Sequence, residues 1–242
     1  MQPSEPIVEV KNVSKYFGKK KVLENVSFTV FKREILLIIG LSGTGKSTLL
    51  KLICNLEEPD SGEVILKTNN IGMVFQGAAL FDSLNVFDNV AFPIVNSKIK
   101  LQDYEIEKRV LEKLKLVGLA GMEYYRVDEL SGGMKKRVSF ARAIIDNPEI
   151  ILYDEPTSGL DPVVSHVIVD YILKLQNELN ASGVLVTHNL NIVKKIASRV
   201  ILLYDAKIVW EGISKDLFVS ENPYVKQFVE GAIKGPMVVI KE

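Results

Sequence analysis

The segment that most constrains the fold is residues 34–50, with the sequence EILLIIGLSGTGKSTLL. It starts with an apolar run, residues 35–39, that has the length of a buried strand. A loop of the pattern Gly-x-x-x-x-Gly-Lys-Ser follows at Gly40, and residues 47–56 then carry apolar residues at helical spacing. A strand, a glycine-rich loop and a helix in this order are typical of a phosphate-binding loop. The segment therefore predicts an α/β fold in which this loop binds a nucleotide.

Each part of this loop has a physical role toward a phosphate. Its glycines allow backbone angles that a side chain would forbid, so main-chain amides can turn toward an anion. The N-terminus of the following helix adds partial positive charge. Lys46 would reach the β- and γ-phosphates, and the Ser47 hydroxyl would bind Mg²⁺. The alternative, a chance glycine turn, is disfavoured because both flanks have the expected pattern. The predicted nucleotide-binding residues are Gly40, Leu41, Ser42, Gly43, Thr44, Gly45, Lys46, Ser47 and Thr48.

Length and charge narrow the class of protein. A chain of 242 residues, 47% of them hydrophobic, can form one large α/β domain, alone or with a subdomain. Lys+Arg and Asp+Glu balance at 30 each, which argues against a general electrostatic binder of nucleic acid. The single cysteine, Cys54, excludes an internal disulfide and fits a reducing compartment; its place in the helix pattern favours a buried core thiol. No apolar run has the roughly 18–20 residues of a membrane span, so membrane association is expected through a partner.

The opening third of the chain is predicted to be mostly β. Residues 7–13 and 26–30 alternate apolar and polar side chains, and residues 63–66 and 71–75 read as short strands. Phe17 lies between the first two alternating segments, beside Tyr16 and a glycine. Its ring could stack on a nucleobase or pack in the core.

The middle of the chain is predicted to be helical. Apolar residues recur at helical spacing after residue 80, and we expect residues 84–147 to form a helical subdomain inserted in the α/β core. Near its end Ser131, Gly132 and Gly133 open a basic helix. This helix start could be a second anion-binding site. Equally, Ser131 could be an ordinary helix cap.

The next predicted strand, residues 150–155, ends in two acidic residues. Asp154 would bind Mg²⁺ directly or through water, and Glu155 would polarise the attacking water. This pattern is weak alone and strong after a phosphate-binding loop. Asp161 and Pro162 then have the residue types of a helix N-cap and first position.

Two further polar residues end predicted strands. Gln76, after residues 71–75, could contact Mg²⁺ and the attacking water, or simply be a polar strand terminus. His188, after residues 183–187, could contact the γ-phosphate, although a lone histidine there is usually structural.

The C-terminal part, residues 213–242, is predicted as a helical extension with a tail. It follows a hairpin of residues 199–204 and 207–211 that turns at Asp205-Ala206. Short helices are expected near residues 215–220 and 224–232, and residues 237–242 are expected to be a free tail.

These stretches together resemble the ATP-binding cassette (ABC) ATPases over roughly residues 7–230. Six motifs stand in the family's order: the loop 40–48, Gln76, the signature 130–134, Asp154-Glu155, the loop 158–161, and His188. The resemblance implies a P-loop core with an antiparallel β subdomain and a helical subdomain. It also implies that Phe17 stacks on adenine, with Tyr16 as the alternative.

The resemblance further implies a mechanism. Two cassettes pair head-to-tail, and each of two ATP molecules lies between Lys46 of one chain and Ser131 to Gly133 of the other. Asp161 would contact the facing phosphate-binding loop. Glu155, oriented with His188 and Gln76, would hydrolyse ATP, with Mg²⁺ held by Ser47, Gln76 and Asp154. A single cassette therefore requires a second copy or a second cassette chain.

Three short stretches indicate a subfamily: the signature LSGGM, the segment GAALFDSLNVFDNVAFP after Gln76, and the tail QFVEGAIKGP. They look like the ATP-binding subunit of Mla/Mce-type phospholipid transporters of bacteria. This implies a peripheral protein on the cytoplasmic face of the inner membrane, with a permease dimer and an Mce-type lipid-binding protein as partners. The segment from residue 62 to 76 is shorter than the family leads us to expect, which suggests a trimmed β subdomain.

Two other readings stay open. One is a transporter for amino acids or another small solute, or for lipoprotein release. The other is an ABC ATPase that works with soluble partners in cofactor assembly or on nucleic acid. An apolar, aromatic segment after Gln76 favours a permease groove over a nucleic-acid surface, although part of it should pack in the subdomain core. Its apolar residues are Leu80, Phe81, Leu84, Phe87 and Phe92.

Overall fold

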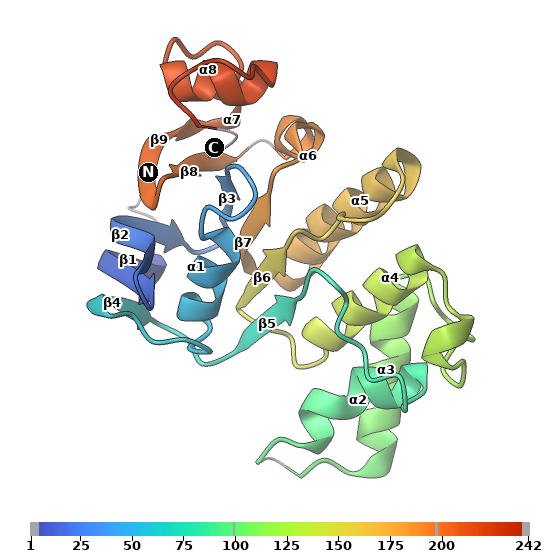
Figure 1. Ribbon diagram of the computed structural model, residues 1–242. Helices are drawn as coiled ribbons and strands as arrows, with labels where there is room; N and C mark the ends of the chain where they lie inside the picture. Colours follow the sequence, from blue (N-terminus) through green and yellow to red (C-terminus); the bar gives the residue numbers. More distant parts are fainter. Residues whose placement is uncertain (1–4, 99, 197, 239–242) are drawn as a thin grey trace. The chain divides into compact units, whose positions relative to one another are not determined.

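The computed structural model describes residues 5–98, 100–196 and 198–238. They divide into two compact units. Unit 1 comprises the described residues of 1–69 and 182–242, and unit 2 comprises those of 70–181. Unit 2 is therefore inserted in the sequence of unit 1 (Figure 1).

Unit 1 contains a three-stranded antiparallel sheet. Its strands are β1 (Pro6–Phe17), β2 (Lys20–Phe31) and β4 (Ser61–Leu66), in the order β2-β1-β4. The alternating side chains put Val8, Val10 and Val30 on the buried face, as the sequence pattern predicts. This sheet is the expected antiparallel β subdomain.

A second group of strands in unit 1 is centred on β3 (Ile35–Ile39). Parallel strands flank it on both sides, β7 (Ser182–Thr187) and β8 (Arg199–Tyr204), and β9 (Lys207–Ile213) pairs with β8 antiparallel. Every residue of β3 and β7 is buried, which is why the sequence of β3 is a continuous apolar run. The helices of this unit are α1 (Lys46–Ile53), α6 (Leu190–Lys195), α7 (Ser214–Leu217) and α8 (Pro223–Glu230).

The turn between β8 and β9 is as predicted. Tyr204 pairs with Lys207, so the connection is the dipeptide Asp205-Ala206. Both of its residues have positive φ, +44° and +67°, the geometry that two-residue hairpins require.

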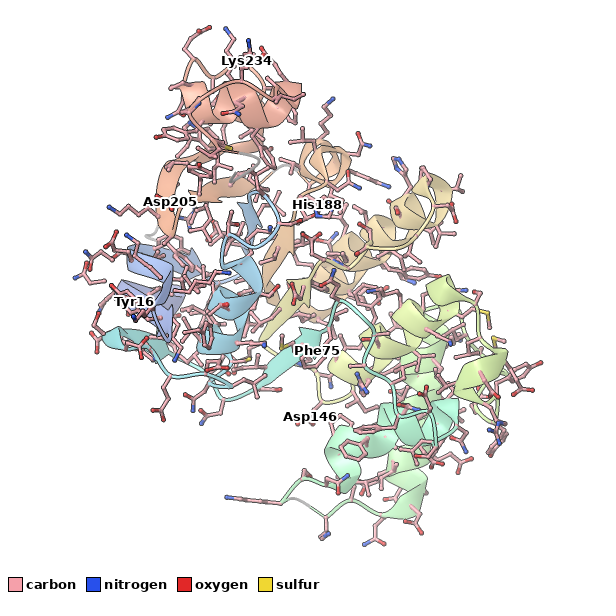
Figure 2. The ribbon with its side chains drawn as sticks, viewed as in Figure 1. Tyr16, Phe75, Asp146, His188, Asp205 and Lys234 are labelled. Atoms are coloured by element: carbon pink, nitrogen blue, oxygen red, sulfur yellow. The ribbon has the colours of Figure 1, made fainter. Side chains whose placement is uncertain are left out.

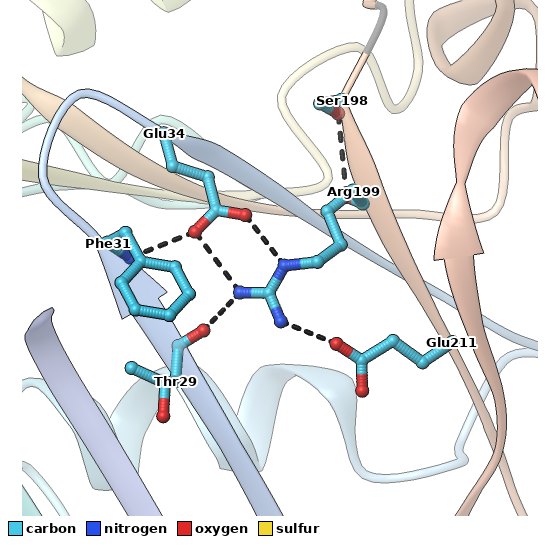
Figure 3. A network of polar contacts seen from close by, with 6 residues as sticks. All are labelled: Thr29, Phe31, Glu34, Ser198, Arg199 and Glu211. Carbon is cyan, nitrogen blue, oxygen red and sulfur yellow. Dashed lines mark hydrogen bonds and ion pairs between the residues drawn. The ribbon is translucent and has the colours of Figure 1, made fainter. Parts of the chain in front are cut away.

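A polar network centred on Arg199 joins the two sheets of unit 1. The guanidinium of Arg199, on β8, makes two hydrogen bonds to the carboxylate of Glu34, which precedes β3 (Figure 3). It also donates to the Thr29 carbonyl of β2 and to Glu211 of β9, and lies 5.5 Å from the centre of the Phe31 ring. Burial alone would lower the pKa of Arg199, but its bonds to the two carboxylates raise it overall. The network therefore stabilises the junction of four strands.

Unit 2 combines a strand pair with helices. Strands β5 (Ile71–Val74) and β6 (Ile150–Asp154) pair in parallel. The helices are α2 (Val86–Val95), α3 (Asp103–Leu116), the short 3₁₀ helix η1 (Val127–Glu129), α4 (Gly132–Ala143) and α5 (Pro162–Leu179). Helix α4 packs against α2, α3 and β5 (Figure 1). The helices predicted between residues 84 and 147 are present, and the chain has the predicted mixed α/β architecture.

The prediction of a free tail is wrong for the two tail residues that the structure describes. Met237 is buried, its amide donates to Gln227 Oε1 at 2.6 Å, and its carbonyl accepts from Gln227 Nε2 at 2.9 Å. The amide of Val238 donates to the Tyr204 hydroxyl at 2.7 Å. Residues 239–242 lie outside the described residues. One side chain on α8 thus fastens the segment that follows the helix.

The end of α1 also differs from the prediction. The helix stops at Ile53 because Asn55 takes a left-handed conformation with φ +58°, and apolar Leu56 beyond it is exposed. Cys54 is the C-cap of the helix and is half-buried, with Sγ 3.5 Å from the Lys51 carbonyl oxygen. It is therefore a helix-end residue, not the core thiol that the pattern predicts. Burial raises the pKa of its thiol.

No helix in the described part of the chain is long and apolar enough to span a bilayer.

Candidate nucleotide-binding and hydrolysis site

The predicted phosphate-binding loop connects β3 to α1 in unit 1. Gly40 has φ +153°, and a Cβ there would lie 2.3 Å from the Leu203 carbonyl oxygen. Gly45, with φ +100°, precedes α1, and a Cβ there would lie 2.7 Å from the Val22 carbonyl oxygen. Only glycine fits at these two positions, because any other residue meets backbone atoms. The loop is therefore built so that its main chain runs close to β2 and β8.

Lys46 is folded back over this loop. The residue is buried, and its ammonium donates to the carbonyl oxygens of Gly40, at 2.9 Å, and Leu41, at 2.8 Å. Thr44 Oγ1 also donates to the Leu41 carbonyl, at 2.9 Å. The ammonium of Lys46 thus lies beside the loop at the start of α1, where the helix dipole is positive. An anion bound here would be attracted both by the ammonium and by the helix dipole. Of the other predicted loop residues, Ser42 and Gly43 are exposed, and Ser47 and Thr48 are half-buried in the first turn of α1.

His188 and Phe17 also belong to unit 1. Ile39 pairs with Thr187 in parallel, so the next residues, Gly40 and His188, leave their strands at the same end of the sheet. His188 is labelled in Figure 2. His188 is exposed there. Phe17 is the last residue of β1 and its side chain is 47% exposed, so its ring is accessible and is not core packing. Its hairpin includes Val22, whose carbonyl faces Gly45, and so the hairpin adjoins the phosphate-binding loop.

Unit 2 brings the acidic pair and Gln76 together. Asp154 ends β6 and Glu155 follows it with a positive φ of +44°; both carboxylates are nearly buried. The Gln76 side chain is exposed, and its Nε2 donates to Ser158 Oγ at 3.3 Å, in the loop that follows Glu155. The prediction that these residues act together is consistent with this arrangement.

A buried lysine accompanies them. Lys136 of α4 is 5% exposed, and its ammonium donates to the main-chain carbonyls of Phe75, at 3.4 Å, and Gln76. Burial lowers the pKa of Lys136, and the charges of Asp154 and Glu155 act in the opposite direction. The ammonium of Lys136, on the helix that begins at the signature residues, therefore interacts electrostatically with the buried pair Asp154 and Glu155.

The signature residues and the Asp161 loop also meet within unit 2. Ser131 is the N-cap of α4, with Oγ accepting from the Met134 amide at 3.3 Å, and Asp161 is the N-cap of α5, accepting from Val164 at 3.0 Å. A Cβ on Gly133 would lie 2.8 Å from a methyl carbon of Val164, so this glycine lets the two helix starts approach. They line one open cleft of about 440 Å³, together with Gly132 and Leu160. Ser131 is thus a helix cap, and its exposed position also leaves it accessible to a ligand.

Sequence reasoning missed two residues that support this arrangement. The sequence predicts only a basic helix here, whereas the structure buries Lys136 and Arg142 of α4, and both donate to the loop after β5. No short-range pattern shows this, because their partners are main-chain carbonyls sixty or more positions away, as with Arg142 and Ala79.

The residues present fit ATP and Mg²⁺. The phosphate-binding loop offers a lysine, a hydroxyl and a helix start with a glycine N-cap, which suits phosphate oxygens. Among the described residues no cluster of three or more His, Cys, Asp or Glu could hold a metal by itself.

Comparison with known proteins agrees with this chemistry. The family model described as "ABC transporter" matches residues 23–158. The chain is 38% identical to the intermembrane phospholipid transport system ATP-binding protein MlaF of Haemophilus influenzae, over 96% of this chain and 93% of that protein. It is 40% identical to the methionine import ATP-binding protein MetN of Clostridium tetani, over 93% of this chain and 74% of that protein.

A solved structure extends the comparison to three dimensions. It is the dimeric, post-hydrolysis state of the ATP-binding cassette MJ0796 bound to ADP and Pi. Its TM-score with this chain is 0.77 at 34% identity, over 86% of this chain and 98% of that one. The chain therefore belongs to the ABC transporter family, as one of its ATP-binding and ATP-hydrolysing subunits.

Proposed function

We propose that this subunit uses Mg-ATP hydrolysis to energise phospholipid transport through a membrane permease. The similarity to the Haemophilus influenzae phospholipid transport protein, along nearly the whole of both chains, carries this proposal. The signature LSGGM and the segment after Gln76 support it, because both look like that subfamily. The same similarity supports a place on the cytoplasmic face of a bacterial inner membrane, and an Mce-type lipid-binding protein as a further partner.

The proposed hydrolysis divides the work among residues of both units. Lys46 and the amides of the loop hold the phosphates, and Phe17 stacks on the adenine. Bound Mg²⁺ would neutralise charge on the β- and γ-phosphates, held by Ser47, Asp154 and the side chain of Gln76. Glu155 accepts the proton of the attacking water, and His188 orients the γ-phosphate. The proposal requires that these two sets of residues act on the same nucleotide.

We further propose that the active form is a head-to-tail homodimer. The similarity to a dimeric cassette supports pairing of two copies. In our proposal Ser131, Gly132 and Gly133 of one copy bind the γ-phosphate held by the other copy, and Asp161 contacts its phosphate-binding loop. ATP would then favour the closed dimer because it binds both halves only in that state.

An exposed aromatic pair supports a protein partner in the membrane. Phe81 and Phe92 stack with ring centres 4.5 Å apart, and about two-fifths of each side chain is exposed. Asn89, fully buried on α2, fixes the Phe81 main chain from both sides, donating to its carbonyl and accepting from its amide. A rigid exposed aromatic pair is suited to receive an apolar segment of a permease. Packing in the subdomain core explains the covered parts of the Phe81 and Phe92 rings but not their exposed parts.

Transport of a small solute is the second candidate, favoured by the similarity to the methionine import protein. The two are separated by reconstituting the subunit with its co-purified permease in lipid vesicles. We expect ATP to drive transfer of a fluorescent phospholipid, and a complex with Lys46→Ala to give only the ATP-independent rate. ATP-driven methionine uptake without lipid transfer would contradict the proposal.

A further inference from the structure

The loop after β5, residues 75–79, has an unusual backbone. Ala78 and Ala79 both have positive φ, +63° and +49°, although neither is glycine. Consecutive alanines in the left-handed region are unfavourable, since the Cβ of each crowds its own backbone. Such a conformation persists only where surrounding groups hold it. The turn Phe75–Ala78, closed by a 3.0 Å hydrogen bond between the Ala78 amide and the Phe75 carbonyl, is one such contact.

Helix α4 supplies the other contacts that hold this backbone, through the side chains of two buried cations. Lys136 donates to the carbonyls of Phe75 and Gln76. Arg142 donates through Nη1 to the Ala79 carbonyl at 2.7 Å and through Nη2 to the Ala78 carbonyl at 2.8 Å. Four of the five carbonyls of this loop therefore accept hydrogen bonds from a single helix.

These cations are a costly way to hold a loop. Both residues are more than nine-tenths buried, and main-chain carbonyls do not neutralise a charge. The charges of Asp154 and Glu155 oppose the effect of burial on Lys136 only in part, since its pKa is still lowered. What the two cations share is the loop that carries Gln76, whose side chain reaches Ser158 in the loop after Glu155. We propose that Lys136 and Arg142 are positioning residues for ATP hydrolysis, because they fix the main chain that aims the Gln76 side chain. The helix that begins with the signature thus also sets the direction of Gln76.

The inference rests on the role proposed above for Gln76 in binding Mg²⁺ and orienting water. A loosened loop should leave ATP binding by Lys46 intact and slow the chemical step. Displacement of a positioning group by about 1 Å can cost about 10²-fold in rate. We therefore expect a loss of about 10- to 100-fold in kcat, with the ATP dissociation constant changed less than about twofold.

The first test needs no nucleotide. Amide hydrogen exchange is measured on the full ligand-free chain for wild type, Lys136→Met and Lys136→Gln. Methionine and glutamine are each one atom shorter than lysine, but methionine loses the donor, whereas glutamine keeps an N–H donor without the charge. We expect exchange of residues 76–79 to rise at least tenfold in Lys136→Met, to stay near wild type in Lys136→Gln, and to be unchanged in β6 for both.

The second test is steady-state hydrolysis with the same three proteins. Lys136→Met should lower kcat as stated, and Lys136→Gln should recover most of it. The inference is overturned if amide exchange in Lys136→Met is unchanged, or if exchange is faster but kcat stays at the wild-type value. It is also overturned if Lys136→Gln shows the same exchange and kcat as Lys136→Met.

Two further variants keep the outcomes separable. If Lys136→Met does not fold, Arg142→Lys tests the same idea, because lysine is shorter and lacks the planar guanidinium fork whose two nitrogens each bond one carbonyl. Faster exchange at residues 78–79 with lower kcat supports the inference, and wild-type behaviour overturns it. Gln76→Ala tests the underlying role. Wild-type hydrolysis in Gln76→Ala would refute the role of Gln76, and with it the catalytic part of the inference. The amide exchange of residues 76–79 would then still test whether Lys136 and Arg142 hold the loop.

Discussion

Replacing Arg199 by methionine should destabilise unit 1 far more than an ordinary surface charge change. The side chain is 23% exposed and Glu34 is 17% exposed, so the pair is largely shielded from water. Arg199→Met removes both bonds to Glu34, the bond to Glu211 and the donor to the Thr29 carbonyl (Figure 3). It leaves the Glu34 carboxylate with the Phe31 amide as a donor at 2.9 Å.

The magnitude follows from this burial. Removing one partner of a fully buried pair costs about 3–5 kcal/mol, and exposed pairs contribute about 0–1 kcal/mol. For a pair that keeps partial contact with water we expect a loss of about 2–3 kcal/mol in the free energy of unfolding. In a chain of this size that corresponds to a fall of roughly 5–10 °C in Tm.

Urea denaturation followed by circular dichroism measures this directly. Lys11→Met is the matched control, because Lys11 lies 3.9 Å from an exposed Glu63 and 3.1 Å from Glu9; we expect it to cost less than about 1 kcal/mol. A double-mutant cycle of Arg199→Met with Glu34→Gln should give a coupling energy above about 1 kcal/mol. A loss for Arg199→Met no larger than that of Lys11→Met, or a coupling energy near zero, would refute the reasoning.

Three other changes have defined outcomes. Lys46→Ala should abolish tight binding of Mg-ATP in a fluorescent-nucleotide titration, because the phosphates lose their main cationic partner; near-normal affinity would argue against the loop's role. Ser131→Arg should bind ATP as a dilute monomer with wild-type affinity but hydrolyse none, since the bulky side chain fills the gap meant for the partner's phosphate; a loss of monomer affinity would place Ser131 in its own chain's pocket. Cys54 should react with iodoacetamide at pH 7 several-fold more slowly in the folded chain than in guanidinium, since burial raises its pKa and lowers the thiolate fraction; equal rates would contradict this.

Features that depend on neighbouring residues could be predicted from the sequence. The run Ile35–Ile39 is a central parallel strand, and such strands are apolar on both faces. Asp161 caps α5 with Pro162 in its first turn, a preference set by local hydrogen bonding. The order of the motifs identified the family because each motif carries a separate chemical requirement.

Features set by distant contacts could not be predicted. The tail is fastened because Gln227 reaches Met237, and no periodic pattern encodes one side chain bonding to a later main chain. The sequence indicates only a basic helix around Lys136, and the burial of Lys136 and Arg142 follows from the way α4 packs on β5. The positive φ of Ala78 could not be predicted either, because alanine is not a residue type that indicates positive φ.

The most direct test of the account is the ATP-dependent dimer. Glu155→Gln keeps the size of the side chain and loses the carboxylate, so ATP should bind and remain unhydrolysed, with turnover reduced by about 10²–10⁴-fold. Size-exclusion chromatography with light scattering should then show a dimer in Mg-ATP and mainly monomer without nucleotide, and addition of Ser131→Arg to the same chain should abolish the dimer. A Glu155→Gln protein that stays monomeric in saturating Mg-ATP, or that hydrolyses ATP at the wild-type rate, would contradict the account.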